Sequence, residues 1–138
     1  MIMPDTKPTL SFVASNSDDA QIALKELRDQ YDHVPFSEAD VVVALGGDGF
    51  MLQVLNDTMN SGKSVYGMNR GSVGFLMNDY RTDNLHERIA VASGNDFHPL
   101  RMTAHDVNGK IHTALAMNEV SVFRQSHQAA KLQVRVDG

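Results

Sequence analysis

One apolar run, ADVVVAL (39–45), constrains the fold of this 138-residue chain more than any other feature. A continuous run of branched apolar residues is typical of a strand buried on both faces, as in a parallel sheet covered by helices. The run stops at a Gly-Gly-Asp-Gly turn (46–49), and a helical pattern of apolar residues follows at once. The sequence therefore predicts a buried parallel strand that ends in a glycine-rich turn with one carboxylate.

Two further strands and two helices alternate around this run. Strands are predicted over 9–15 and 64–69, and helices over 17–31 and 50–60. Ser17 is a suitable N-cap for the first helix, because its side-chain oxygen can accept a bond from a free backbone N–H and acidic residues follow it. The alternation of strands and helices predicts an α/β layer with parallel strands and right-handed crossovers.

The pattern changes after Pro99. Residues 70–81 match neither a helix nor a strand, and 82–94 predict a short amphipathic helix that stops at Gly94. Beyond Pro99, apolar and polar residues alternate on both sides of Asn108-Gly109, a dipeptide that strongly favours a β-hairpin. The sequence therefore predicts antiparallel β-structure in this part of the chain.

A last alternating segment, KLQVRVDG (131–138), predicts one more strand. We therefore predict an α/β domain over 1–98 and the first strands of a C-terminal β domain over 99–138. Three strands close neither a sandwich nor a barrel, and an open apolar sheet favours aggregation. We expect that the chain is the front part of a longer protein, or that a partner subunit completes the sheet.

Composition excludes several classes of function. The net charge of −5 gives no support to a nucleic-acid or anionic-membrane partner, although a local basic pocket is compatible with it. No apolar stretch approaches the roughly 18 residues of a membrane span, and the start MIMPDTKPTL lacks the pattern of a secretory signal. The absence of cysteine excludes disulfides and thiol nucleophiles within this chain and agrees with a cytoplasmic location.

The Gly-Gly-Asp-Gly turn suits phosphate chemistry. Gly46, Gly47 and Gly49 let backbone N–H groups approach a phosphate, and the N-terminus of the following helix favours an anion at the same place. Asp48 would repel a phosphate, but a carboxylate there can orient a hydroxyl, accept its proton or hold Mg²⁺. The alternative is an ordinary tight turn in which Asp48 caps the next helix.

A second segment supports the phosphate interpretation. The stretch GMNRGSVGFL (67–76) follows the third predicted strand, at the same edge of the sheet. Arg70 can meet a phosphate or a carboxylate, and Phe75 can offer a flat face to a base. The alternative for Phe75 is a core aromatic.

A third segment, AMNEVSVF (116–123), places two polar residues in the middle of a predicted apolar strand. Adjacent residues on a strand point to opposite faces, so a charged Glu119 beside Asn118 needs a partner or water. Ribose hydroxyls are natural partners for this pair, and the alternative is a solvated carboxylate on an edge strand. His105 and His112 lie opposite each other if the hairpin has a two-residue turn, but two histidines alone do not indicate a metal site.

These three segments together resemble the NAD kinase family, in its bacterial form. The Gly-Gly-Asp-Gly turn, the segment Asn-Arg-Gly-x-x-Gly-Phe-Leu and the Asn-Glu pair occur in that family in this order, and the resemblance covers most of 40–123. It implies an N-terminal α/β domain and a C-terminal β domain with NAD bound between them. It further implies an enzyme that assembles as a dimer or tetramer through the β domain.

The resemblance also implies an activity and residue roles. The terminal phosphate of ATP, or of polyphosphate in some members, is transferred to the 2′-hydroxyl of the adenosine ribose of NAD, with Mg²⁺, to give NADP. Asp48 would be the proton acceptor, and the three glycines would cradle phosphate. Phe75 would lie against a base, and Asn118 and Glu119 would hold NAD. The family's second glycine-rich segment is absent from these 138 residues, so the isolated chain is expected to be inactive or nearly so.

Two alternatives remain open at this stage. The first is another kinase with a Gly-Gly-Asp-Gly turn, acting on a sugar phosphate or a lipid. The Asn-Arg-Gly segment and the Asn-Glu pair argue against it. The second is a module that binds NAD without chemistry, which the same residues would serve equally well.

Overall fold

The computed structural model describes residues 6–72 and 74–138. The first five residues, on which the absence of a secretory signal was judged, lie outside this description. The chain divides into two units, one up to His98 and one from Pro99 onward. Each unit is described by itself. The assignment of the second unit as the start of a larger β domain stays a prediction.

The first unit contains a three-stranded parallel sheet in the order β1–β2–β3. Its strands are β1 (Leu10–Ala14), β2 (Val41–Gly46) and β3 (Ser64–Asn69). All six residues of β2 are buried, which confirms the central buried strand expected from the apolar run. The α/β fold class is confirmed, and all three strands lie where the sequence predicts them.

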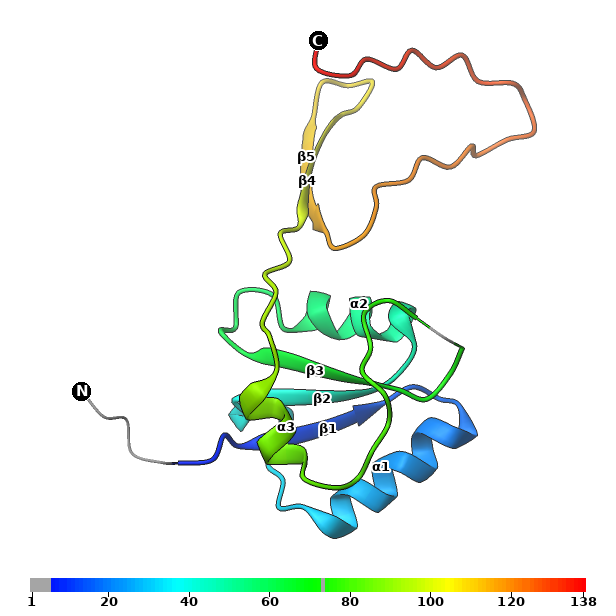
Figure 1. Cartoon of the computed structure of the whole chain (residues 1–138). Coiled ribbons are helices and arrows are strands. Elements are labelled where there is room, and N and C mark those ends of the chain that lie inside the picture. Colours follow the sequence, from blue (N-terminus) through cyan, green and yellow to red (C-terminus); the bar gives the residue numbers. More distant parts are fainter. Residues whose placement is uncertain (1–5, 73) are drawn as a thin grey trace. The chain divides into compact units, whose positions relative to one another are not determined.

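Helices cover both faces of this sheet (Figure 1). Helix α1 (Asp18–Gln30) packs through its buried residues on the face that carries Leu10 and Phe12. Helix α2 (Asp48–Asp57) packs on the opposite face, where Met51 contacts the side of the sheet that carries Val42. Successive residues of a strand point to opposite faces, so the unbroken apolar run of β2 supplies both layers of the core.

The two crossovers have opposite hands. Both connections step across the sheet in the same direction, from β1 to β2 and from β2 to β3, but α1 and α2 lie on opposite faces. The expectation that both crossovers are right-handed therefore does not hold. The arrangement removes both faces of β2 from water, which two helices on one face would not do.

Helix α1 begins where the sequence predicts it. Ser17 is the N-cap, and its hydroxyl accepts a hydrogen bond from the backbone N–H of Ala20 at 3.3 Å. A short 3₁₀ turn (Phe36–Glu38) then precedes β2. Helix α2 begins two residues earlier than expected, at Asp48, with Gly47 as its N-cap.

Helix α3 (Leu85–Val91) is shorter than predicted. It ends at Ala92, which is in an extended conformation, so the expected stop at Gly94 is wrong. Asn84 precedes the helix with a positive φ of 47°, a conformation that asparagine tolerates better than most residues.

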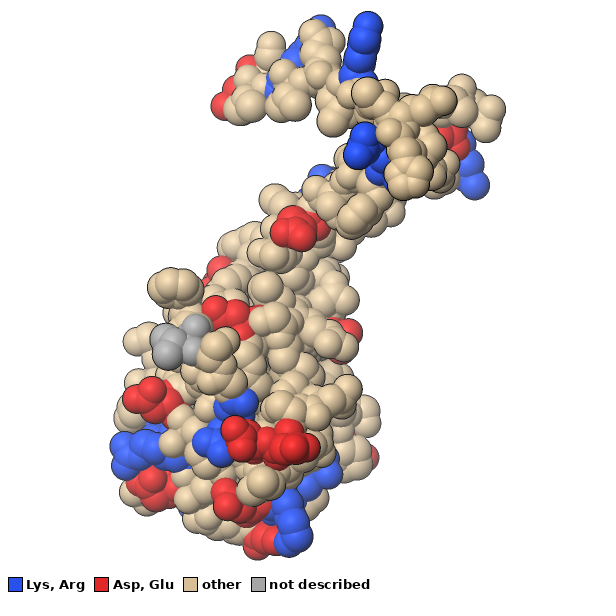
Figure 2. All heavy atoms as spheres, turned by 90° about the vertical axis from the view of Figure 1, so that its right-hand side faces the viewer, with Lys and Arg blue, Asp and Glu red and all other residues tan. Residues whose placement is uncertain are grey.

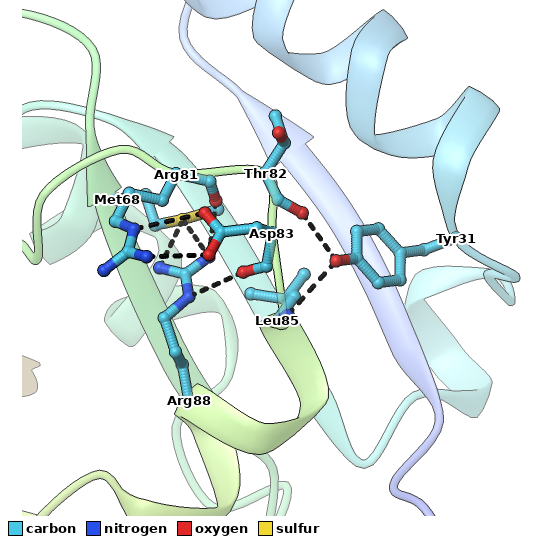
Figure 3. Close-up of polar contacts among 7 residues, drawn as sticks. All are labelled: Tyr31, Met68, Arg81, Thr82, Asp83, Leu85 and Arg88. Carbon is cyan, nitrogen blue, oxygen red and sulfur yellow. Dashed lines mark hydrogen bonds and ion pairs between the residues drawn. The ribbon is translucent and has the colours of Figure 1, made fainter.

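Contacts with the end of α1 and with β3 hold the start of α3 in place (Figure 3). The hydroxyl of Tyr31, just after α1, donates to the carbonyl of Thr82 at 2.5 Å and accepts the N–H of Leu85 at 3.2 Å. On the other side, the guanidinium of Arg88 donates to the carbonyl of Asp83 at 3.0 Å and lies 3.8 Å from the sulfur of Met68 on β3. These contacts fix α3 on the α1 face of the sheet.

The second unit contains an antiparallel hairpin of β4 (Leu100–His105) and β5 (Ile111–Ala116). The predicted hairpin is confirmed, but its turn has three residues rather than two. The backbone N–H of Asp106 donates to Lys110, and Gly109 takes a φ of 80°. As a result His112 pairs with Ala104 rather than with His105, so the two histidines do not lie opposite each other.

Within the described residues, no strand follows Ala116. The strand expected over 131–138 is absent, and the segment that contains Asn118 and Glu119 is irregular rather than strand. A strand is stable only when its backbone groups pair with a neighbour and one face packs on a core. Residues 117–138 have no such neighbour in this structure, and nearly all of them are exposed.

Candidate functional site

The carboxyl ends of β2 and β3 lie side by side. Gly46, the last residue of β2, is paired with Asn69, the last residue of β3. The backbone N–H of Arg70 then donates to the carbonyl of Gly46 at 2.8 Å, so the two loops separate only after this point. Two of the three segments singled out in the sequence, residues 46–49 and 67–76, therefore meet at one edge of the sheet.

The glycine turn forms the first turn of α2. Gly47 is the N-cap with no side-chain capping bond, and neither Gly47 nor Gly49 has an atom within 4 Å of the position of an added Cβ. The first backbone N–H groups of a helix lack partners inside the helix, and the helix dipole places partial positive charge there. The turn therefore offers open N–H groups of the kind that bind phosphate.

Asp48 links this turn to the loop after β3. Its Oδ2 accepts the backbone N–H of Phe75 at 2.9 Å, and its Oδ1 accepts the backbone N–H of Leu76 at 3.0 Å. The carboxylate does not cap α2, so the alternative in which Asp48 serves only as a helix cap does not describe this structure. Both carboxylate oxygens instead hold the neighbouring loop.

Gly74 makes this contact possible. A Cβ added at Gly74 would lie 2.7 Å from Cγ of Asp48 and 2.9 Å from its Oδ2, closer than carbon and oxygen atoms approach each other. Gly74 was not among the candidate site residues. The sequence does show a glycine directly before Phe75. That glycine can be recognised as a site residue only when the structure shows that Asp48 lies beside it.

Asn69 shapes the first part of the same loop. Its Oδ1 accepts the backbone N–H of Gly71 at 2.9 Å, and its Nδ2 donates to the carbonyl of Ser72 at 3.1 Å. The side chain thus replaces backbone partners in a tight turn, a common use of asparagine. Asn69 is a structural residue of this loop that the sequence analysis did not single out.

Arg70 points toward α1. Its guanidinium carbon lies 4.4 Å from the centre of the Tyr80 ring, and its Nε donates to the carbonyl of Asp19 at 3.5 Å. The hydroxyl of Tyr80 donates to Oε2 of Glu26 at 2.6 Å. Burial raises the pKa of Tyr80 to about 12, with help from the hydrogen bond to Glu26 and its charge, while Arg70 opposes the rise.

Phe75 is fully exposed, with a relative accessible surface of 100%. The alternative that Phe75 is a core aromatic is therefore excluded in this structure. An aromatic ring in water gains nothing from packing, so its free face is available to a ligand.

The third segment lies in the other unit. Asn118 and Glu119 are both exposed, and Nδ2 of Asn118 donates to Oε2 of Glu119 at 3.3 Å. Their neighbours in the sequence form no strand. The prediction that Glu119 is a charged residue inside an apolar strand is therefore wrong for this structure. These two residues belong to the second unit, whereas Asp48 belongs to the first.

A hollow of about 480 Å³ lies on the α2 side of the sheet. It does not include Asp48, the Asn69 turn or Phe75, so nothing links it to the chemistry of the sheet edge. Its walls are mostly apolar and come from Val13, Ala14, Phe36, Phe50, Gln53, Val54 and Asp57.

Charge and metal-ligand geometry add little to the site. On the face in Figure 2, Lys and Arg side chains are interspersed with Asp and Glu. Over residues 6–72 and 74–138, no group of three or more His, Asp or Glu side chains is arranged to hold a metal ion. Within the same residues, no helix is long and apolar enough to cross a membrane.

At this edge of the first unit, an open helix N-terminus and a carboxylate lie at the end of a central parallel strand. This arrangement is suited to binding a phosphorylated ligand, and it defines the class of α/β protein to which the first unit corresponds. No family model matches the chain. Individual proteins do match. The chain is 65% identical over 131 residues to an NAD kinase of Rhizobium meliloti (strain 1021), a match that covers 94% of the chain and 51% of that protein.

Two further matches agree. The chain is 52% identical over 136 residues to an NAD kinase of Brucella suis, covering 99% of the chain and 53% of that protein. It is 50% identical over 129 residues to an NAD kinase of Caulobacter vibrioides, covering 94% and 50%. The chain is therefore similar over nearly all of its length to proteins named NAD kinase, and it spans about half the length of the curated relatives it matches.

Proposed function

We propose that the protein containing this chain is an NAD kinase, which transfers the terminal phosphate of ATP, or of polyphosphate, to the 2′-hydroxyl of the adenosine ribose of NAD to give NADP. The similarity to proteins named NAD kinase supports this activity. The structural observation that carries it is the position of Asp48, at the N-terminus of α2 and bonded to the loop of Phe75.

In this proposal Asp48 orients the ribose hydroxyl and accepts its proton. Each oxygen of the carboxylate takes one backbone N–H, and an ionised carboxylate has about four acceptor sites. Lone pairs therefore remain for a hydroxyl. Gly47 and Gly49 receive phosphate oxygens at the start of α2, where the dipole and free N–H groups favour negative charge, and Gly46 leads the chain from β2 into this cradle.

The remaining residues bind rather than react. Phe75 stacks on a base through its exposed ring. Arg70, stacked on Tyr80, contributes positive charge near the glycine turn. Asn118 and Glu119 hold NAD through its ribose and amide groups, once the second unit is in its working position.

A divalent cation fits this site only together with ATP. Mg²⁺ is usually held by one or two carboxylates and the phosphates of the nucleotide, and it neutralises charge on the transferring phosphate. The described residues supply the Asp48 carboxylate but no cluster of ligands for a resident ion. We therefore propose that Mg²⁺ arrives with the nucleotide.

We further propose a cytoplasmic location, where ATP and NAD are available, and a homo-oligomer formed through the β domain. Leu100, Ile111 and Leu115 of the hairpin are all at least 45% exposed, which supports an apolar contact in the assembled protein. Light scattering on the purified protein tests this: a monomer at micromolar concentration contradicts it.

The activity is tested by coupling NADP formation to an NADP-specific dehydrogenase, with NAD, ATP and Mg²⁺ as substrates. We expect turnover in the parent protein. For Asp48→Asn we expect kcat to fall by roughly 10²–10⁴, the usual contribution of a general base. Asparagine keeps one acceptor oxygen, so it also loses one of the two backbone bonds. The fall in kcat must therefore be measured at saturating NAD.

Other outcomes lead to other functions. If the parent protein binds NAD but shows no turnover, the protein is a non-catalytic NAD-binding module. In that case the role of Asp48 is to hold the loop of Phe75 through its two hydrogen bonds. Stabilisation by sugar phosphates or lipids, but not by NAD or NADP, indicates a different kinase.

A further inference from the structure

Few contacts of the described residues determine where the Phe75 ring lies. The ring is fully exposed, so no packing fixes it. Residues 70–77 form neither a helix nor a strand where they are described, so no regular backbone ladder fixes it either. The hydrogen bond that holds the backbone of Phe75 is the one from its N–H to Asp48.

Other parts of the loop have their own anchors. Asn69 closes the turn through Gly71 and Ser72, and Arg70 is held by Tyr80. These contacts come before residue 73 or after residue 77, and they leave the backbone at 75 and 76 to Asp48. Leu76 adds packing against the α2 core, but its backbone N–H also depends on Asp48.

We propose that Asp48 and Gly74 form a clasp that presents the Phe75 ring to the adenine of the dinucleotide, so that Asp48 is a positioning residue for binding as well as the proton acceptor. The clasp consists of the Asp48 carboxylate, the backbone N–H groups of Phe75 and Leu76, and the missing side chain of Gly74. This inference rests on the proposed function, because it takes NAD as the ligand.

The chemistry of the clasp calls for a carboxylate. Hydrogen bonds from N–H groups to a charged oxygen are stronger than those between neutral groups, and only a carboxylate can accept on both sides. The N-terminus of α2 favours the negative charge. Because the backbone at Phe75 is held before the ligand arrives, binding has to order only the torsions of the ring, which costs less entropy than ordering the loop as well.

The substitution Gly74→Ala breaks the hydrogen bonds of the clasp without removing the carboxylate of Asp48. The added methyl group displaces Asp48 from its two N–H partners but leaves the carboxylate in the protein. Gly71→Ala is the matched control, because an added Cβ there has no neighbour closer than 4.0 Å. Both glycines lie in the same loop, and neither has a positive φ.

The experiment uses Phe75→Trp as a reporter in the whole protein. These 138 residues contain no tryptophan, any tryptophan elsewhere in the protein is changed to phenylalanine, and the exposed site at residue 75 accepts the larger ring. Fluorescence anisotropy of the tryptophan reports its mobility without ligand. Quenching by added NAD reports binding, and the coupled assay gives kcat and KM for the same variants.

We expect Gly74→Ala to lower the anisotropy and to raise the Kd for NAD about tenfold, the effect of losing one charge-assisted bond. At saturating NAD its kcat also falls, because the displaced carboxylate is the proposed proton acceptor, but it falls less than the kcat of Asp48→Asn, which has no base. Asp48→Asn lowers the anisotropy as well, and Gly71→Ala matches the reporter protein. A thermal melt of each variant confirms that it is folded.

The proposal is overturned if Gly74→Ala and Gly71→Ala both keep the anisotropy and NAD affinity of the reporter protein while Asp48→Asn loses turnover alone. A reporter protein that neither binds NAD nor forms NADP, and whose anisotropy still falls with Gly74→Ala, contradicts the proposed function but leaves the clasp in place. The two failures are therefore distinguishable.

Discussion

Glycines at the sheet edge have two different physical reasons to be glycine. Gly47 and Gly49 face open space, so any requirement for them must come from a ligand rather than from the protein itself. Gly67 and Gly74 face side chains of the protein at distances that a methyl group can occupy only if those side chains move. A sequence motif does not separate these cases, but the neighbours of an added Cβ do.

At this scale we predict that Gly67→Ala is destabilising. An added Cβ at Gly67 would lie 2.6 Å from the sulfur of Met77 and 3.1 Å from that of Met51. Overpacking a buried site costs roughly 1–3 kcal/mol, and flexible methionines should keep the cost near the lower end. Urea denaturation measures it. Gly94→Ala, with no atom within 4 Å of the added Cβ, is the control and should change stability by less than about 0.5 kcal/mol.

A second residue-scale prediction concerns Tyr80. Burial and the bond to Glu26 raise its pKa to about 12, so the folded protein keeps this proton when an ordinary tyrosine has lost it. The stabilisation is fully present below pH about 10, the usual tyrosine pKa, and is lost as the pH rises toward 12. Absorbance titration should show a late tyrosine that disappears in Tyr80→Phe. A late titration that persists in Tyr80→Phe would assign it to another tyrosine.

At the scale of the element, helix α1 begins at the N-cap that the local sequence predicts. Ser17 caps the helix, and Asp18 and Asp19 lie in its first turn, where negative charge is favoured. The start of α2 shows the opposite case. No side chain caps it, and Gly47 leaves its N–H groups open at the candidate site. A well-capped helix stabilises the fold, whereas an uncapped one is free to bind.

We therefore predict that Ser17→Ala lowers the free energy of unfolding by about 1 kcal/mol, the usual value of an N-cap. The hydroxyl of Ser17 also lies 3.2 Å from that of Ser15, which adds to the loss. Thermal or urea denaturation provides the measurement. Ser37→Ala, an exposed serine in the short 3₁₀ turn, serves as the control. Equal effects of the two substitutions would show that the cap contributes nothing.

At the scale of the whole molecule, an exposed stretch separates the two units. Residues 92–98 are irregular and exposed, after a helix that Tyr31 and Arg88 hold on the first unit. Exposed irregular segments are where proteases cut folded chains. The first unit carries both core clusters, so it has the buried area to remain folded after such a cut.

We predict that, in a Phe75→Ala variant that lacks the fully exposed competing site, limited chymotrypsin digestion cuts early at Phe97, which is 45% exposed, and releases a resistant fragment that ends there. Phe12, at 1% exposure, should remain uncut in the same digest and is the internal control. Mass spectrometry of the time course identifies the fragment. Simultaneous loss of both sites would show that the first unit does not fold as a domain by itself.

The sequence alone predicted what depends on short-range pattern. The branched run of β2, the helical spacing and cap of α1, and the glycine-containing hairpin each have a local physical cause, so all three were found. The same patterns placed Asp48 at the carboxyl end of a buried strand. The predicted strand at 131–138 had the right alternation but failed, because alternation stabilises a strand only where a neighbouring strand pairs with it.

Only the tertiary structure decided what depends on contacts between distant segments. It placed α1 and α2 on opposite faces of the sheet, brought Gly74 against Asp48, and turned the ring of Phe75 into solvent. The physical reason is that a carboxylate, unlike an apolar run, does not specify its partner in the sequence around it. The partners of Asp48 lie 27 and 28 residues along the chain, and only the pairing of β2 with β3 brings them within a hydrogen bond.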